Sequence, residues 1–469
     1  MSGAARLGAV GILLGVVVAA GQLTAGPAAE RPVGQQLPVT ARTAVCPDVR
    51  QDGDRGASTV TAAGGSTRTA GPLVGSRAPV APGPVARDLA AGLEGAVHVT
   101  TATGADAGAL VVEQTTRATA GTRRGVAALT CPTPSAESWF VGGATVLGTS
   151  SELLLVNGEP TAATVDVTVW TSTGRADPRP GREIRVPPRT RIAVPLDRLA
   201  PDRDLLALRV AATTGRVASA LRVVRVDGRT PLGTDWVPPS PGPARESVVP
   251  GLPDGPGRRT LLVTNPGDIA TTVSAELTTD DGQYVPDDLQ AIEVPAGTSV
   301  AVDLSDALAD TSAAVRVRSD GAPVLAGALV VDRQDGSVRE IAFAAATPAL
   351  DGPSLMADVR LSPPTEVLLM LSAIGTDAVV ELVPVAAPGQ LPDPQRVEVP
   401  AATTVAVRLS RFLPPGSTGS LGIEVRPLSG RVHAARYSRE RGSRGPFTTL
   451  LPVLPGTTSV TAPAVVGIP

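Results

Sequence analysis

The sequence of 469 residues contains no lysine and few residues that could act as metal ligands or catalytic bases. It has two histidines and two cysteines, and 2% of its residues are aromatic. A structural zinc site usually takes four cysteine or histidine ligands, and His98 and His433 are far apart in the chain. We therefore expect no metal and no cofactor, and hydrophobic cores built from valine, leucine, alanine and isoleucine.

Motifs of the common catalytic classes are also missing. There is no Gly-x-Ser-x-Gly elbow, no His-Glu-x-x-His and no glycine-rich phosphate loop. Both histidines fall in alternating segments and are interpreted as residues of a core rim. The cluster Asp280, Asp281, Asp287 and Asp288 is interpreted as a solvated hairpin loop. Acidic residues are plentiful, so an activity based on a carboxylate pair stays open, but no pair stands out. We predict that the protein is not an enzyme.

What the sequence does contain is a repeat. Three segments keep their apolar positions and vary their polar ones, and they begin 108 and 105 residues apart. Each ends in a strict alternation of apolar and polar residues, which is typical of a strand with one buried face. A proline-containing turn precedes the alternation, so each segment is expected to form a β-hairpin. The segments are residues 184–196 (IRVPPRTRIAVPL), 292–304 (IEVPAGTSVAVDL) and 397–409 (VEVPAATTVAVRL).

The period of about 100 residues, with six or seven short strands, predicts an all-β protein of tandem immunoglobulin-like or fibronectin-like β-sandwiches. A β-propeller with two blades per repeat is the alternative. Asn157 and Asn265 are 108 residues apart and are expected at equivalent turns. We place the start of each repeat at an aromatic residue. The predicted domains are a signal peptide or membrane anchor (1–29), a divergent β unit with both cysteines (30–138), and three sandwich repeats (139–235, 236–342 and 343–469), the last with a C-terminal closing strand.

The N-terminus predicts export. Arg6 precedes an apolar run that is followed by small residues, with no acidic residue before Glu30, which is the pattern of a secretory signal. The run is short for a membrane span, but an uncleaved anchor is an alternative. Because oxidising compartments favour disulfides, we predict that Cys46 and Cys131 are bonded to each other. We expect the chain to be secreted, or held outside the cell membrane by its N-terminal segment.

Charge is distributed unevenly along the chain. Residues 254–340 contain 15 acids and 6 arginines, whereas residues 395–446 contain 9 arginines and 3 acids. The arginine-rich segment could dock an anionic glycopolymer or an acidic protein of the cell envelope, or it could lie against its acidic neighbour; both interpretations stay open. No aromatic residues interleave with the arginines, so nucleic acid is not expected. The candidate partner-binding basic face consists of Arg431, Arg436, Arg439, Arg441 and Arg444.

Several motifs resemble a family of uncharacterised exported proteins of actinobacteria. They are Cys46 followed by proline, a second Cys-Pro at Cys131 shortly before Trp139 and Phe140, and tandem repeats without lysine. The resemblance extends from Ala44 onward, and it implies no catalytic residue because the family has no assigned activity. It favours a structural or interaction protein of the cell envelope; an envelope carbohydrate- or glycopolymer-binding protein is the alternative. An exposed aromatic ring beside a groove would favour that alternative, because sugars stack on such rings.

Overall fold

The chain falls into two compact units, of which the larger spans Val39–Thr458. The described part of the smaller unit is an antiparallel pair of strands, β1 (Gln36–Pro38) and β37 (Ser459–Thr461). The predicted signal peptide or anchor at 1–29 lies outside the described residues, and no helix within them is long and apolar enough to cross a membrane. The computed structural model describes residues 36–50, 56–90, 96–308, 311–334, 338–361, 365–386, 390–412, 419–441 and 445–461.

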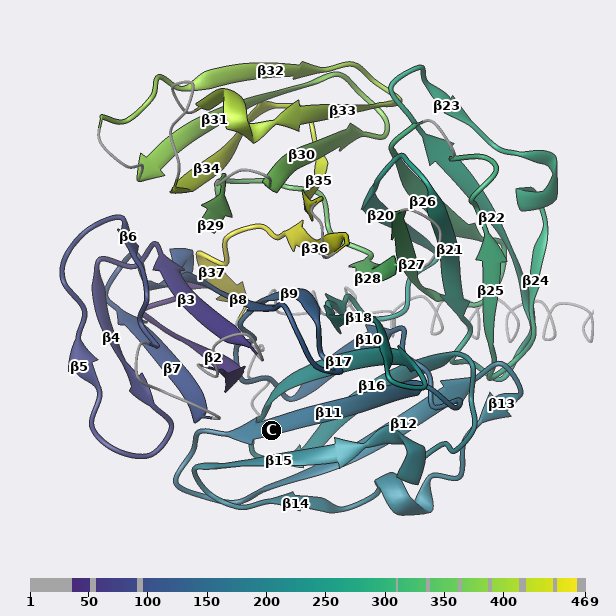
Figure 1. The fold of residues 1–469 in the computed structure, drawn as a ribbon, viewed down its shortest axis with the longest axis horizontal. Helices are drawn as coiled ribbons and strands as arrows, with labels where there is room; N and C mark the ends of the chain where they lie inside the picture. The colour runs from purple at the N-terminus through teal and green to yellow at the C-terminus, as the bar shows by residue number, and fades with distance from the viewer. Residues whose placement is uncertain are drawn as a thin grey trace, which may run out of the picture. The chain divides into compact units, whose positions relative to one another are not determined.

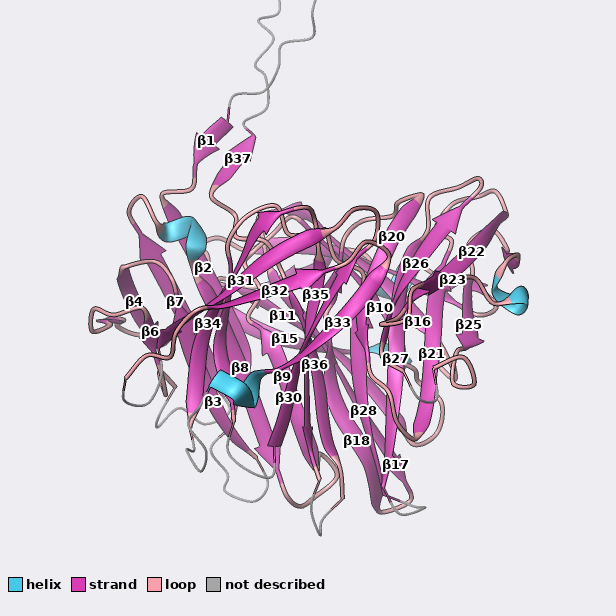
Figure 2. Cartoon of the chain, turned by 90° about the horizontal axis from the view of Figure 1, so that it is seen from above, coloured by secondary structure: helices cyan, strands magenta, loops and turns pink. Residues whose placement is uncertain are grey.

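The larger unit is all-β, as the sequence predicts. Its strands form antiparallel sheets, and the helical elements among the described residues are short 3-10 turns (Figure 1 and Figure 2). These turns are η2 (Ala107–Ala109), η3 (Arg179–Gly181), η4 (Leu196–Arg198), η5 (Asp287–Leu289) and η6 (Leu409–Phe412).

The sheets form four β-sandwiches in chain order, each with two sheets around a hydrophobic core. In the third sandwich, buried Val249, Leu277 and Val315 of one sheet pack with Leu261 and Val330 of the other. Burial of these aliphatic side chains stabilises each sandwich by about 1.5–3 kcal/mol per residue. The chain passes back and forth between the two sheets of each unit, whereas a propeller blade is a run of consecutive strands, so the repeats are sandwiches.

The first two sandwiches have equivalent strand orders in both of their sheets. The first consists of β2 (Ala41–Val49), β3 (Ala57–Ala63), β4 (Thr67–Pro72), β5 (Ala78–Pro79), β6 (Val85–Ala86), β7 (Ala96–Thr103), β8 (Val111–Ala118) and β9 (Gly125–Thr130). The second consists of β10 (Glu137–Val141), β11 (Thr149–Asn157), β12 (Ala163–Thr171), β13 (Gly174–Arg175), β14 (Ile184–Val186), β15 (Thr190–Pro195), β16 (Leu206–Thr214), β17 (Ala218–Asp227), β18 (Thr230–Val237) and β19 (Pro239–Ser240). Their sheets are β2-β7-β4-β5 with β6-β3-β8-β9, and β13-β12-β16-β10-β19 (β14 beside β12) with β15-β11-β17-β18.

The last two sandwiches repeat this arrangement. The third consists of β20 (Glu246–Leu252), β21 (Gly257–Thr264), β22 (Thr271–Thr278), β23 (Gln283–Tyr284), β24 (Ile292–Val294), β25 (Ser299–Asp303), β26 (Ala313–Ser319), β27 (Leu325–Gln334) and β28 (Val338–Ala345). The fourth consists of β29 (Ser354–Arg360), β30 (Thr365–Ala373), β31 (Ala378–Ala386), β32 (Gln395–Val399), β33 (Thr403–Arg408), β34 (Ser420–Ser429), β35 (His433–Glu440) and β36 (Phe447–Val453). Their sheets are β20-β26-β22-β23 (β24 beside β22) with β25-β21-β27-β28, and β29-β34-β31-β32 with β33-β30-β35-β36.

The thirteen-residue repeat connects the two sheets of a sandwich and is not a hairpin. In the third sandwich β24 pairs with β22 in one sheet and β25 pairs with β21 in the other, so the chain changes sheets at Pro295. The hairpin prediction was wrong because a turn signal does not specify which strands pair across it. The alternation is as predicted: Val300 and Val302 pack on the core, and Ala301 and Asp303 are exposed.

Two buried asparagines hold equivalent turns in the second and third sandwiches. Nδ2 of Asn157 donates to the carbonyl oxygen of Val186 at 3.1 Å, and Nδ2 of Asn265 donates to that of Val294 at 3.2 Å. Each acceptor precedes the proline of the repeat, so the asparagine ties the turn to the crossing segment. In the fourth sandwich Ser372 occupies this position and bonds a threonine hydroxyl instead.

The aromatic residues expected at repeat starts lie at different places in the sandwiches. Trp139 is on β10, the first strand of the second sandwich, whereas Trp236 and Phe343 are on β18 and β28, which are edge strands near the ends of the second and third. Trp236 is opposite Arg222 of β17, so a boundary at 236 would divide a sheet. The boundaries lie instead between β19 and β20 and between β28 and β29. Phe447 begins β36, which pairs with β35 and closes the fourth sandwich.

One edge strand from each sandwich contacts the next in the cyclic order β9, β18, β28 and β36 (Figure 1). Two carboxylates are completely buried on them. Asp235 accepts hydrogen bonds from the backbone N–H of Ala128 (3.3 Å) and the hydroxyl of Thr449 (3.1 Å), and Glu340 accepts one from the backbone N–H of Thr234 (2.8 Å). Burial raises the pKa of both carboxyls well above its usual range, although these hydrogen bonds oppose the shift.

Candidate functional site

The first sandwich contains the predicted disulfide. Cys46 of β2 is bonded to Cys131, which directly follows β9, and both side chains are buried. The bond joins segments 85 residues apart and connects the two sheets of the sandwich. Because disulfides persist in oxidising compartments, this bond indicates a location outside the cytoplasm.

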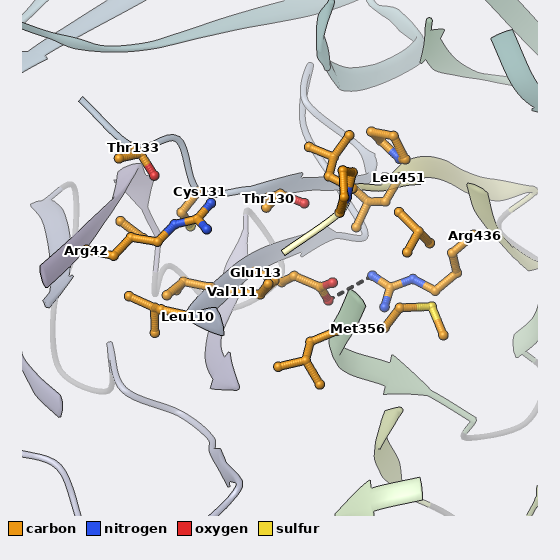
Figure 3. Close-up of a pocket in the computed structure, with 17 residues that line it drawn as sticks. Arg42, Leu110, Val111, Glu113, Thr130, Cys131, Thr133, Met356, Arg436 and Leu451 are labelled. Atoms are coloured by element: carbon orange, nitrogen blue, oxygen red, sulfur yellow. Dashed lines mark hydrogen bonds and ion pairs between the residues drawn. The ribbon is translucent and has the colours of Figure 1, made fainter. Parts of the chain in front are cut away.

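The predicted basic face does not exist as one exposed surface, because Arg436 is buried. Its Nη2 donates to Oε2 of Glu113 at 2.9 Å, and both side chains are about 5% exposed or less (Figure 3). The pair lines a cavity of about 40 Å³ beside Arg42 and Met356. It joins the fourth sandwich to the first, whereas Ala435 and Tyr437 of the same strand pack against the acidic third sandwich, as the second interpretation expected. A buried charge needs a close counter-charge, which explains why Arg436 is turned inward.

The other arginines of that segment are divided between pairing and solvent. Nη2 of Arg439 donates to Glu366 at 2.9 Å within the fourth sandwich. Arg431 and Arg441 are exposed. Arg444 lies outside the described residues. The four described arginines are therefore in different environments: Arg436 is buried, Arg439 is paired within its sandwich, and Arg431 and Arg441 are exposed.

The two histidines are in separate sandwiches. His98 is fully buried with its Nε2 at 3.1 Å from the hydroxyl of Thr100, and burial together with Arg77 lowers its pKa to about 4. Nδ1 of His433 donates to the carbonyl oxygen of Thr347 at 3.0 Å, and burial lowers its pKa to about 4 against the effect of that bond. No group of three or more potential ligands is placed to hold a metal ion in the described part of the chain.

The acidic loop around η5 is exposed to solvent. Asp280 accepts a hydrogen bond from the hydroxyl of Thr311 at 2.9 Å, and Asp287 accepts one from Gln290 at 2.9 Å. These local bonds fix the loop, and they leave the side chains of Asp280, Asp281, Asp287 and Asp288 in water.

A cleft of about 720 Å³ lies between the second and third sandwiches. One wall comes from β17 and the loop that precedes β11, and the other from β21, β27 and β28. Its volume lies in the range of ligand-binding sites in proteins. It is the candidate functional site because of the charges that converge on it.

Four arginines line this cleft, which we call the arginine cleft. Arg333 and Arg339 are directly opposite each other on β27 and β28, a placement that destabilises an antiparallel pair when the charges are alike. Nε of Arg258 lies 3.4 Å from a carboxylate oxygen of Asp303, in a pair more than half exposed. Among the described residues, Arg225, Arg333 and Arg339 form no ion pair.

The environment of Arg225 shows how little negative charge the cleft contains. Burial lowers the pKa of Arg225, and Arg339 and Arg258 lower it further. Nε of Arg339 is buried and has no hydrogen-bond partner in the described residues, which costs about 1–3 kcal/mol. Asp204 also lines the cleft, but it accepts a hydrogen bond from Ser172 at 2.6 Å. In the described part of the lining, four arginines are therefore set against a single carboxylate, that of Asp204.

Sequence reasoning missed the arginine cleft. Residues 254–340 look acidic as a segment, yet three of their six arginines, Arg258, Arg333 and Arg339, line it. The sequence contained a local signal for it. In "LVVDR" (329–333) and "REIAF" (339–343), an arginine falls on the same strand face as two apolar residues. Counting charges over whole repeats averages out such a signal, and Arg225 joins the cluster from another sandwich.

Comparison with known proteins defines the class of this all-β protein. A model of a family of unknown function (DUF5719) matches residues 86–410, and the chain belongs to this family. The match includes the second and third sandwiches and the arginine cleft. No curated protein matches the chain.

One solved structure shows a short region of similarity. The crystal structure of Thermotoga maritima 1070 is 17% identical, over 23% of this chain and 95% of its own, with a TM-score of 0.20. A score this low supports no conclusion about fold or function.

Proposed function

We propose that this chain is an exported interaction protein of the cell envelope that holds an anionic envelope component in the arginine cleft and catalyses no reaction. The observation that carries the proposal is the convergence of Arg225, Arg258, Arg333 and Arg339 with one exposed carboxylate partner among the described residues. Arginine binds phosphate and carboxylate groups through paired N–H donors, so an anion is the ligand such a cluster favours.

The burial of the tryptophans favours a ligand recognised by its charge over a sugar recognised by stacking on an aromatic ring. Trp139, Trp170 and Trp236 are 9%, 5% and 3% exposed, so none offers an open ring face. Tyr284 is 43% exposed, but its hydroxyl donates to the carbonyl oxygen of Ala307 and it does not line the cleft. An uncharged carbohydrate would therefore lack the stacking surface that such ligands use, and an anionic glycopolymer fits the cleft better.

Location supports the same proposal. The Cys46–Cys131 disulfide suits an oxidising compartment, and the signal segment predicted at 1–29 would direct the chain there. Anionic polymers and lipids are major components of bacterial envelopes, so the cleft would meet suitable ligands after export.

The test compares phosphorylated dextran with neutral dextran of the same length, each titrated into the full chain. We expect binding of the phosphorylated polymer alone, weakened at least tenfold by Arg258→Gln/Arg333→Gln/Arg339→Gln. The matched control replaces three exposed arginines outside the cleft, Arg182, Arg185 and Arg245, with glutamine. Equal binding of both polymers, or equal loss in both triple variants, would contradict the proposal.

A further inference from the structure

The arginine cleft is polar at one end and apolar at the other. Side chains two residues apart on a strand share a face, and β28 presents Arg339, Ile341 and Phe343 in that spacing. The adjacent strand β27 presents Arg333, Val331 and Leu329, and the two series lie in register as opposite pairs. The charged pair therefore lies near the turn that connects β27 to β28, and the apolar pairs lie farther from that turn.

The same gradient continues on the neighbouring strands. On β21, Arg258 is followed on the same face by Thr260 and Leu262, with Arg258 in register with Val331. On β17, Val223 precedes Arg225. All four strands therefore place an arginine toward one end of the cleft and aliphatic or aromatic carbon away from it.

The rim of the cleft carries an exposed leucine. Leu147 is fully exposed, and its turn is fixed because the backbone N–H of Val226 donates to the carbonyl oxygen of Gly148 at 2.7 Å. Gly148 has φ of +83°, and a side chain there would meet that strand, since a Cβ would lie 2.5 Å from the carbonyl oxygen of Val226. Thr149, which follows this turn, is opposite Arg225, so Leu147 lies at the arginine end of the cleft and is not part of its apolar lining.

We infer that the ligand of the arginine cleft is an anionic amphiphile, with a phosphate or carboxylate group at the arginine end and an aliphatic portion on Leu329 and Val331, which are half-buried. This inference rests on the proposed function and specifies its ligand class. A purely ionic ligand would leave the accessible parts of Leu329 and Val331 in contact with water, and a purely apolar ligand would leave the arginines without a counter-ion. An amphiphile satisfies both ends at once.

Calorimetric titration of the full chain with three small probes tests the inference. The probes are dodecyl phosphate below its micelle-forming concentration, glucose 6-phosphate and dodecyl maltoside. They separate a phosphate on an aliphatic chain from a phosphate on a sugar and from an uncharged amphiphile. We expect dodecyl phosphate to bind at least tenfold more tightly than either of the others, because burial of about two methylene groups suffices for that factor.

Two variants assign the effect to the two ends of the cleft. Arg333→Gln/Arg339→Gln should weaken dodecyl phosphate and glucose 6-phosphate alike. Thr260→Phe should fill the apolar part and remove the preference for dodecyl phosphate, while glucose 6-phosphate binds as before. Thermal unfolding of each variant verifies that it folds, and Val331→Phe is the second filling variant if Thr260→Phe does not.

Each remaining outcome decides the matter. Equal affinity for dodecyl phosphate and glucose 6-phosphate would overturn the amphiphile and leave the proposed anion-binding function standing. Equal affinity for dodecyl phosphate and dodecyl maltoside would show that charge is irrelevant and overturn both. Absence of binding by either phosphate would also overturn both.

Discussion

Two regions between sandwiches contain arginines in opposite situations. Where the first sandwich meets its neighbours, Arg436 is paired with Glu113, and Arg222 is paired with Asp48 of the first sandwich. Both arginine side chains are less than 10% exposed. In the arginine cleft, by contrast, Arg333 faces Arg339 and neither has an ion-pair partner among the described residues.

The difference follows from access to water. A buried guanidinium without a partner would be strongly destabilising, and at these two closed contacts each buried arginine has a carboxylate beside it. Asp48 is an example: burial alone would raise its pKa, but Arg222, Arg50 and Arg191 outweigh that effect and lower it. The cleft is open to solvent, and Arg258 and Arg333 are exposed, so these two arginines can stay hydrated until a ligand supplies the negative charge. The buried ion pairs of Arg436 and Arg222 thus stabilise the fold, whereas the arginines of the cleft are available to bind a ligand.

The largest effect is expected at a closed pair. Arg436→Met leaves Glu113 buried without its partner, and the free energy of unfolding in urea should fall by about 3–5 kcal/mol. Adding Glu113→Gln to this variant should restore most of the loss, because no buried charge then remains. A loss below about 1 kcal/mol for Arg436→Met would show that the Arg436–Glu113 pair behaves as an exposed ion pair and not as a buried one.

The disulfide of the first sandwich should have a comparable effect. Replacing Cys46 and Cys131 with serine should lower the free energy of unfolding by about 2–5 kcal/mol, since the bond constrains a loop of 85 residues in the unfolded chain. A reducing agent should destabilise the natural protein by a similar amount and leave the serine variant unchanged. An effect of the reducing agent on the serine variant would point to another cause.

Buried carboxyls on the central strands predict a pH dependence of intermediate size. The pKa of Asp235 and of Glu340 is raised in the folded state, so their contribution to stability is complete below the usual carboxyl pKa and is lost as pH rises toward the folded pKa. Each group can contribute a slope of up to about 1.4 kcal/mol per pH unit in that window. Thermal unfolding between pH 4 and 9 should show a flatter curve for Asp235→Asn/Glu340→Gln than for the natural protein. An unchanged curve would contradict the raised pKa values.

The smallest effect on stability is expected in the arginine cleft. Arg333→Gln should change the free energy of unfolding by no more than about 0.5 kcal/mol, with an increase at low salt because it relieves repulsion from Arg339. Arg185→Gln, an exposed arginine outside the cleft, is the control. Asp335 lies between β27 and β28 in the chain, outside the described residues. If Asp335→Asn destabilised the protein by as much as a lost ion pair, Asp335 would be the counter-ion of these arginines, and the cleft would not need a ligand to supply one.

The sequence predicted the parts of the fold that depend on local pattern. Alternation gave the strands, the spacing of Asn157 and Asn265 gave the repeat, and the even number of cysteines gave the disulfide. The repeat boundaries were misplaced because Trp236 and Phe343 are buried on strands near the end of their sandwiches, β18 and β28. The presence of an aromatic residue does not show whether it lies at the start or at the end of a sandwich.

The site was harder to predict because its residues meet only in the folded chain. Arg436 pairs with a carboxylate 323 residues away, so its burial could not be seen in a local run of arginines. The arginine cleft combines Arg225 of one sandwich with three arginines of the next, and it depends on how the two sandwiches pack. Composition located positive charge at the C-terminal end, whereas the arginine cleft brings together four arginines from the middle of the chain.

The most direct measurement is a crystal structure of the full chain grown with tungstate, a phosphate analogue that scatters X-rays strongly. We predict a bound tungstate in the arginine cleft, with donors from Arg258, Arg333 and Arg339 and none from the paired Arg436. An empty cleft whose arginines are bonded to carboxylates of the chain itself would contradict the distinction between closed structural pairs and an open binding cluster.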